Sequence, residues 1–274
     1  MRGARALAWR FRQEGEVISR LSGSGDLARP RPDRATAEAA LLLLVAAGAW
    51  AGTVLLARGM AGMTGTMGLG LAVFVPVWTL MMAAMMLPSV VPAASRYARS
   101  ASGSPMARTA GLAVGYLAVW TAAGVPAFGL AWLAGWVTGR HPGPAHVFAV
   151  AVIAACGVYQ LSAPKDRCLT HCRAPLPLPR PDGWAGDLGA GVRHGAYCLG
   201  CCWALMVILI AVGVMNVAAM VGLAVVVLIE RTWRWGPAAG RVFGVAVLAL
   251  AAAVIWLPWL APGLHAAPPM MMMG

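Results

Sequence analysis

The stretch of sequence that decides the fold is residues 197–229, YCLGCCWALMVILIAVGVMNVAAMVGLAVVVLI, which contains no charged residue. As one straight helix its 33 residues would be about 50 Å long, whereas the hydrocarbon core of a bilayer is about 30 Å thick. Gly213 and Asn216 lie near its centre, where glycine relaxes the backbone and asparagine can cap a new helix. The stretch therefore predicts two helices joined by a reversal.

The composition of the whole chain is that of a membrane protein. Of the 274 residues, 60% are hydrophobic and 11% are charged, and the mean hydropathy is +0.74. A water-exposed surface needs about a quarter to a third of its positions charged, so the composition excludes a soluble enzyme. Backbone groups in lipid must be hydrogen-bonded within their own segment, so the apolar runs predict helices. Besides 197–229, these runs are 39–57, 69–94, 109–137, 146–163 and 242–260. We expect an all-α, polytopic transmembrane helix bundle of about seven spans, or six if residues 197–229 form one helix.

The basic residues of the chain predict its topology. The formal net charge is +12, but the arginines flank apolar runs and form no continuous stripe, so we expect the lipid bilayer and no nucleic acid as a partner. With seven spans, the basic loops alternate as the positive-inside rule requires, and only Arg58 and Arg140 fall outside. This predicts a multi-pass protein of the cell inner or plasma membrane with a cytoplasmic N-terminus.

Three segments are expected along the chain. Residues 1–38 are Arg-rich, with Pro30 and Pro32 near the end, and predict a disordered cytoplasmic tail. A cleaved secretory signal fits less well, since about 38 residues are long for the region ahead of its apolar core. Residues 39–262 form the transmembrane helical domain, with a Cys-containing loop at 164–196. Residues 263–274, with Met270 to Met273, form a Met-rich C-terminal tail.

The polar chemistry of the chain rests on sulfur and hardly at all on carboxylates. After residue 38 the acidic residues are Asp166, Asp182, Asp187 and Glu230, and none lies in the middle of an apolar run. This argues against a proton-coupled transporter and against a pore for hard cations. The chain instead contains 16 Met and 6 Cys, and thioether and thiolate ligands favour soft ions such as Cu(I) or Zn.

Five cysteines within 35 residues form the candidate metal site. Three of them have helical spacing that places them on an arc of about 100°, and two precede them in a CxxxC pattern. Such ligand pairs joined by a short segment are typical of metal sites. The expected ligands are Cys168, Cys172, Cys198, Cys201 and Cys202, with His194 as an auxiliary. Copper(I) is the favoured ion, and zinc is the alternative.

A row of methionines extends this prediction into the membrane. Met81, Met82, Met85 and Met86 share one face of the helix expected at 69–94. Methionine is also a common packing residue, so plain packing explains the same pattern. If the row binds metal, it continues the sulfur path inward from the cysteines.

Several strings of the sequence resemble a known family. They are WTLMMAAMMLPSVVP (78–92), YQLSAPKDRCLTHCRAP (159–175), GAYCLGCCWALM (195–206) and GVMNVAAM (213–220). In combination they resemble the DUF2182 family of integral membrane proteins thought to bind metal. The resemblance implies a multi-helix membrane fold, Cys and Met ligands, and a link to copper handling.

The residues and the resemblance together predict a non-enzymatic membrane protein that binds a soft metal, with copper favoured. It would handle the ion, transfer it or insert it into a partner, which would be a metallochaperone or a copper enzyme. Two alternatives stay open. One is a membrane thiol–disulfide oxidoreductase, because CxxC-like spacing near a helix start can activate a thiol. The other is a non-catalytic helical scaffold or subunit of a membrane complex.

Overall fold

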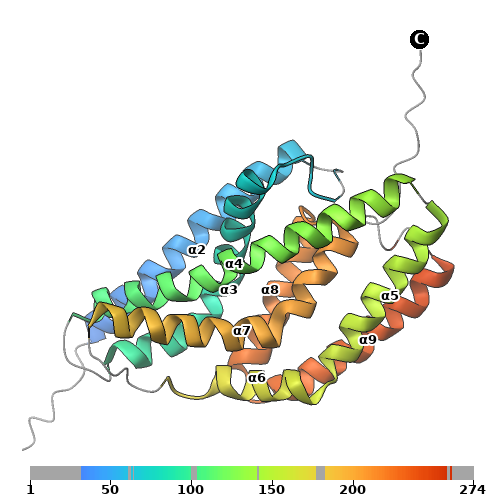
Figure 1. Cartoon of the computed structure of the whole chain (residues 1–274). Coiled ribbons are helices and arrows are strands. Elements are labelled where there is room, and N and C mark those ends of the chain that lie inside the picture. Colours follow the sequence, from blue (N-terminus) through green and yellow to red (C-terminus); the bar gives the residue numbers. More distant parts are fainter. Residues whose placement is uncertain are drawn as a thin grey trace, which may run out of the picture. The chain divides into compact units, whose positions relative to one another are not determined.

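The chain is described here by a computed structural model that covers residues 32–60, 63, 65–99, 104–140, 142–176, 183–257 and 260. The helices, in order, are α2 (Pro32–Met60), α3 (Leu71–Arg99), α4 (Pro105–Arg140), α5 (Pro142–Gln160), α6 (Ala163–Arg173), α7 (Trp184–Val212), α8 (Val217–Thr232) and α9 (Gly236–Trp256) (Figure 1). The described residues contain no strand, so the all-α prediction is confirmed. Most of the expected tail at 1–38 and the whole tail at 263–274, with Met270 to Met273, lie outside the described residues.

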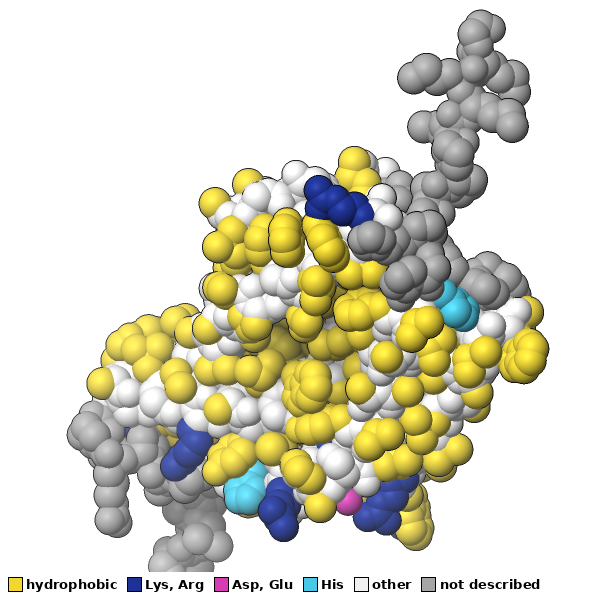
Figure 2. Space-filling view, turned by 45° about the vertical axis from the view of Figure 1, so that its right-hand side comes forward, with side chains coloured by type: hydrophobic (Ala, Val, Ile, Leu, Met, Phe, Trp, Pro, Cys, Tyr) yellow, Lys and Arg dark blue, Asp and Glu magenta, His cyan; other side chains and the backbone are white. Residues whose placement is uncertain are grey.

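The helices have the lengths and composition of membrane spans. Five of them are long and apolar enough to cross a bilayer: α3, α4, α7, α9 and the part of α2 from Ala37. The pair α5 and α6, bent by 57°, gives a sixth if it counts as one span. The 16-residue α8 is shorter but equally apolar in sequence. Hydrophobic side chains dominate the face in Figure 2, where most visible Lys and Arg lie along its lower edge. The expectation of a helix bundle with about seven spans is confirmed.

The stretch 197–229 is broken into two helices as predicted. α7 ends at Val212, Gly213 has a φ of 109°, and α8 starts at Val217. Asn216 caps α8, because its side-chain oxygen accepts a hydrogen bond from the Ala219 amide at 3.0 Å. A positive φ is costly for residues with a Cβ, which explains the glycine at the break.

The segment 164–196, expected as a loop, is largely helical. It contains most of α6 and the first turns of α7. α6 starts where Ser162 accepts a hydrogen bond from the Lys165 amide and a proline occupies the first turn. The cysteines of the CxxxC pattern therefore lie on successive turns of a helix, which fixes their spacing more firmly than a loop would.

Close packing between α4 and α7 depends on glycine. A Cβ at Gly115 of α4 would collide with the backbone carbonyl of Leu188, and one at Gly191 of α7 would collide with that of Leu112. Small residues at such crossings let membrane helices approach closely. This approach brings Tyr116 of α4 next to the cysteine-bearing part of α7.

Charged side chains from separate helices meet at one end of the helices. The contacts are Tyr97–Asp187, Arg108–Asp187, Lys165–Glu230 and Arg241–Asp166. These residues come from segments that the topology prediction places on one side of the membrane. Which side of the membrane this end faces stays a prediction.

Candidate metal centre

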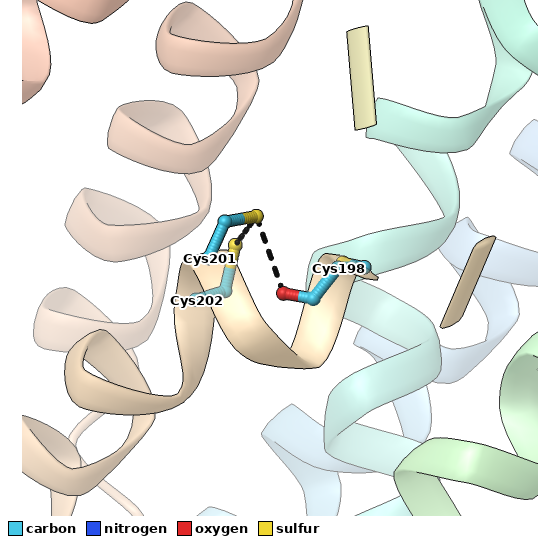
Figure 3. A group of neighbouring side chains, drawn as sticks. All are labelled: Cys198, Cys201 and Cys202. Atoms are coloured by element: carbon cyan, nitrogen blue, oxygen red, sulfur yellow. Dashed lines mark hydrogen bonds between the residues drawn. The ribbon is translucent and has the colours of Figure 1, made fainter. Parts of the chain in front are cut away.

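Three thiols of α7 form the centre of the site. Cys198, Cys201 and Cys202 are all fully buried, and their Sγ atoms lie within 4.8 Å of one another. The Sγ atoms of Cys201 and Cys202 are 3.3 Å apart (Figure 3). Residues three and four apart share one face of a helix, so the spacing seen in the sequence gives this cluster directly.

Helix α6 adds a fourth thiol. The Sγ of Cys172 is buried and lies 3.7 Å from the Sγ of Cys201. One turn earlier, Cys168 is half-buried and packs over Gly200, where a Cβ would come within 2.6 Å of its Sγ. The CxxxC pattern thus places one thiol in the cluster and the other at its edge. We call Cys172, Cys198, Cys201 and Cys202 the thiol cluster.

A buried ion pair attaches α6 to α8. Lys165 Nζ donates to both carboxylate oxygens of Glu230, at 2.8 and 2.7 Å, and Gln160 donates to the same carboxylate. Arg173, at the other end of α6, donates to the backbone carbonyls of Glu230 and Trp233. Burying two charges is costly unless their hydrogen bonds are satisfied, as they are here. The network holds Cys172 in position.

Cys198 lies in a polar network that the sequence did not reveal. Its Sγ is 2.9 Å from the hydroxyl of Tyr116 and 3.2 Å from Nη1 of Arg231. Arg231 is buried, donates to Ser89 Oγ at 2.7 Å, and has its Nη2 2.9 Å from Nε2 of His194. His194 therefore joins the cluster through Arg231. A guanidinium next to a thiol favours the thiolate, and it offsets the negative charge of a metal–thiolate complex.

Arg231 and Tyr116 are the two residues of this network that the sequence did not predict, each for a different reason. Arg231 was counted among the loop arginines, because a basic residue directly after an apolar run is the ordinary topology signal. Tyr116 gave no signal in the sequence, because its position depends on the close approach of α4 and α7.

The methionine row is buried in the same core as the thiols. Met81, Met82, Met85 and Met86 are each at most 1% exposed. Met82 and Met85 precede Ser89 by seven and four residues, so they share its helix face, and Ser89 contacts Arg231. This face of α3 is thus directed toward the Arg231 network, while metal binding by the methionines stays a prediction.

The donor set around the thiol cluster fits a soft ion. Its donors are sulfur atoms, whereas the nearby carboxylate of Glu230 is occupied by Lys165 and Gln160. Thiolate-rich sites select Cu(I) or Zn over hard cations. The sixth cysteine, Cys156 of α5, is buried in the core without a described contact to the cluster thiols.

Comparison with known proteins agrees with this chemistry. A family model described as PpoB2, copper chaperone, matches residues 75–254, about two thirds of the chain, and this range includes every cysteine and His194. Neither a curated protein nor a solved structure is significantly similar to the chain. With this coverage, the chain belongs to the PpoB2 copper chaperone family.

Proposed function

We propose that this protein is a membrane copper(I) chaperone that binds the ion at the thiol cluster and passes it to a partner copper enzyme. The observation that carries the proposal is the meeting of four buried thiols from two helices. Three lie within 4.8 Å of one another, and the fourth is 3.7 Å from Cys201. Thiols collected in this way, with a guanidinium beside them, form a sulfur site for a monovalent soft ion.

Copper(I) is preferred to zinc for two reasons. A cluster of cysteines alone also suits tetrahedral zinc, so the thiols do not decide between the ions. The buried methionines, however, offer thioethers, which are useful to the softer ion. Membership of a copper chaperone family supports the same choice.

The proposed mechanism is ligand exchange without catalytic turnover. Cys168 is half-buried at the edge of the cluster, so it could add a further sulfur ligand to an ion bound there. The Met81, Met82, Met85 and Met86 face would extend the sulfur path into the membrane. We place the thiol end and the N-terminus at the cytoplasmic side of the inner membrane, where reducing conditions keep thiols free. The segment 1–38, apart from the start of α2 at Pro32, and the segment 263–274 would be tails that flank the helical domain.

A thiol–disulfide oxidoreductase is the second candidate, because the Sγ atoms of Cys172 and Cys201 are only 3.7 Å apart. Disulfide exchange, however, requires a thiolate that a partner can reach, and both of these thiols are buried. A stable disulfide that appears on thiol titration under cytoplasmic redox conditions would favour this candidate.

Copper binding tests the proposal directly. Detergent-solubilised protein is loaded with Cu(I) without oxygen, and bound copper and zinc are measured by elemental analysis. The test variant carries Cys198→Ser, Cys201→Ser and Cys202→Ser. The matched control is Cys156→Ser, which also removes a buried thiol but outside the cluster. We expect about one copper per chain in wild type and control and none in the triple variant. Equal copper in all three contradicts the proposal, as does zinc in place of copper.

A further inference from the structure

A small crevice lies between the end of α6 and α7. Its volume is about 150 Å³, and it is lined by His171 and residues 174–176 on one side and by Arg193, His194 and Tyr197 on the other. The rings of His171 and Tyr197, one from each side of the crevice, stack with their centroids 4.6 Å apart. His171 and Arg193 are exposed, so the crevice opens at the charged end of the helices.

Each side of the crevice contains a histidine linked to the thiol cluster. On α7, the buried His194 contacts Arg231 at 2.9 Å, and Arg231 in turn contacts Cys198 Sγ at 3.2 Å. On α6, His171 directly precedes Cys172, which belongs to the cluster. His194 is thus linked to the cluster thiol Cys198 through Arg231, and His171 is the residue before the cluster thiol Cys172. Imidazole is a suitable ligand for copper.

The thiol cluster needs such a path, because its three α7 thiols are completely buried. A larger cavity of about 450 Å³ lies on the opposite face of α7, but its lining is almost entirely apolar and includes Trp78, Trp120 and Trp203. An ion that enters from water pays a large desolvation cost in apolar surroundings. The small crevice, with two histidines, is the better route.

We propose that this crevice is the entrance and exit through which copper(I) reaches the thiol cluster. The inference rests on the proposed function. Arg193 and Arg231 repel a bare cation, so the ion arrives bound to a donor ligand. A histidine nitrogen displaces the donor from Cu(I), and a cluster thiol then displaces that nitrogen and loses its proton to water as the copper–sulfur bond forms. No electron is transferred in this step.

The test compares two alanine-to-tryptophan variants. Ala174→Trp fills the crevice, and the matched control Ala196→Trp fills the apolar cavity on the other face of α7; both alanines are exposed. Cu(I) is presented as its chromogenic bicinchoninate complex, and the rates of loading and of removal by excess chelator are measured. A blocked entrance slows both rates by about tenfold and leaves the affinity unchanged, because a gate alters rates and not end states. Ala196→Trp should keep wild-type rates.

Leu176→Trp is a second filling variant on the same wall, in case Ala174→Trp does not fold. Slower loading and removal in either variant, at unchanged affinity, supports the entrance. Wild-type rates in the filling variants overturn it, and so does slowing by Ala196→Trp alone. If wild-type protein binds no copper at all, the proposed function itself has failed, which is a distinct result.

Discussion

The two faces of α7 differ sharply over the same turns. One face carries Cys198, Cys201 and Cys202 and meets the hydroxyl of Tyr116 and the guanidinium of Arg231. The opposite face carries Leu199, Trp203 and Val207 among others and lines the apolar cavity of about 450 Å³. Both faces belong to one uninterrupted helix, so the difference arises from what each face meets.

The comparison shows when a buried cysteine becomes a candidate ligand. Free cysteine is commonly buried as a small apolar residue. Cys156 fits that description, since it lies in the core of α5 without a described contact to the cluster. The cysteines of α7 differ because other thiols and a positive charge converge on them. The following predictions test whether the two faces differ in function as they do in surroundings.

The largest effect on folding is expected at the crossing of α4 and α7, because this contact fixes the position of both faces of α7. Gly191→Leu places a side chain against the Leu112 carbonyl, so the helices must separate. We expect loss of folded protein, measured by size-exclusion chromatography and thermal unfolding in detergent. Gly189→Leu on the same helix, where a Cβ meets nothing within 4 Å, is the control. Equal stability of the two variants would show that the crossing is not close.

The next largest effect on stability is expected at the ion pair that attaches α6 to α8 and so holds Cys172 beside the thiols of α7. Lys165→Met leaves the buried Glu230 carboxylate without its cation, which costs about 3–5 kcal/mol of stability. The double variant Lys165→Met with Glu230→Met removes both charges and should recover most of this loss. Denaturant or thermal unfolding measures both. A double variant as unstable as the single one would mean that the ion pair is not the cause.

A smaller effect is expected at the charge beside Cys198. Arg231→Met should weaken Cu(I) binding by about 10–100-fold, because it removes the group that orients and balances the thiolate ligand. Arg231→Lys keeps the positive charge but not the several contacts that the guanidinium makes at once, so it should lose less Cu(I) affinity than Arg231→Met. Competition with a Cu(I) chelator measures the affinity. Arg234→Met, an exposed arginine of the same region, is the control, and an equal loss there would assign the effect to net charge alone.

The smallest effect is expected on the apolar face. Trp203→Leu enlarges the cavity without touching the thiols, so Cu(I) affinity should stay within about twofold of wild type, which is about 0.4 kcal/mol. The same chelator competition measures it. A loss as large as that of Arg231→Met would mean that the two faces act as one site.

Local sequence patterns predicted those features that depend on one helix. The break between α7 and α8 follows from Gly213 and Asn216, and the grouping of Cys198, Cys201 and Cys202 follows from their spacing. These features need only backbone preference and helical period, which a single sequence contains.

Features that depend on several helices were not predictable in this way. The helix at α6 was expected as a loop, although Ser162 and Pro164 form a local helix-start signal. Its contact with Glu230, distant in the chain, is not visible in local composition. The position of Tyr116 depends on the close crossing of α4 and α7, which glycines on both helices allow. Arg231 looked like a loop arginine until the packing of α8 buried it beside Cys198.

The most direct test of the central claim, that the thiol cluster is the copper site, is X-ray absorption spectroscopy of the Cu(I)-loaded protein. The account predicts a first coordination shell made of sulfur in wild type and in Cys156→Ser. In the variant with Cys198, Cys201 and Cys202 changed to serine, that shell should disappear. A wild-type shell of nitrogen and oxygen alone, or a sulfur shell that persists in the triple variant, would contradict it.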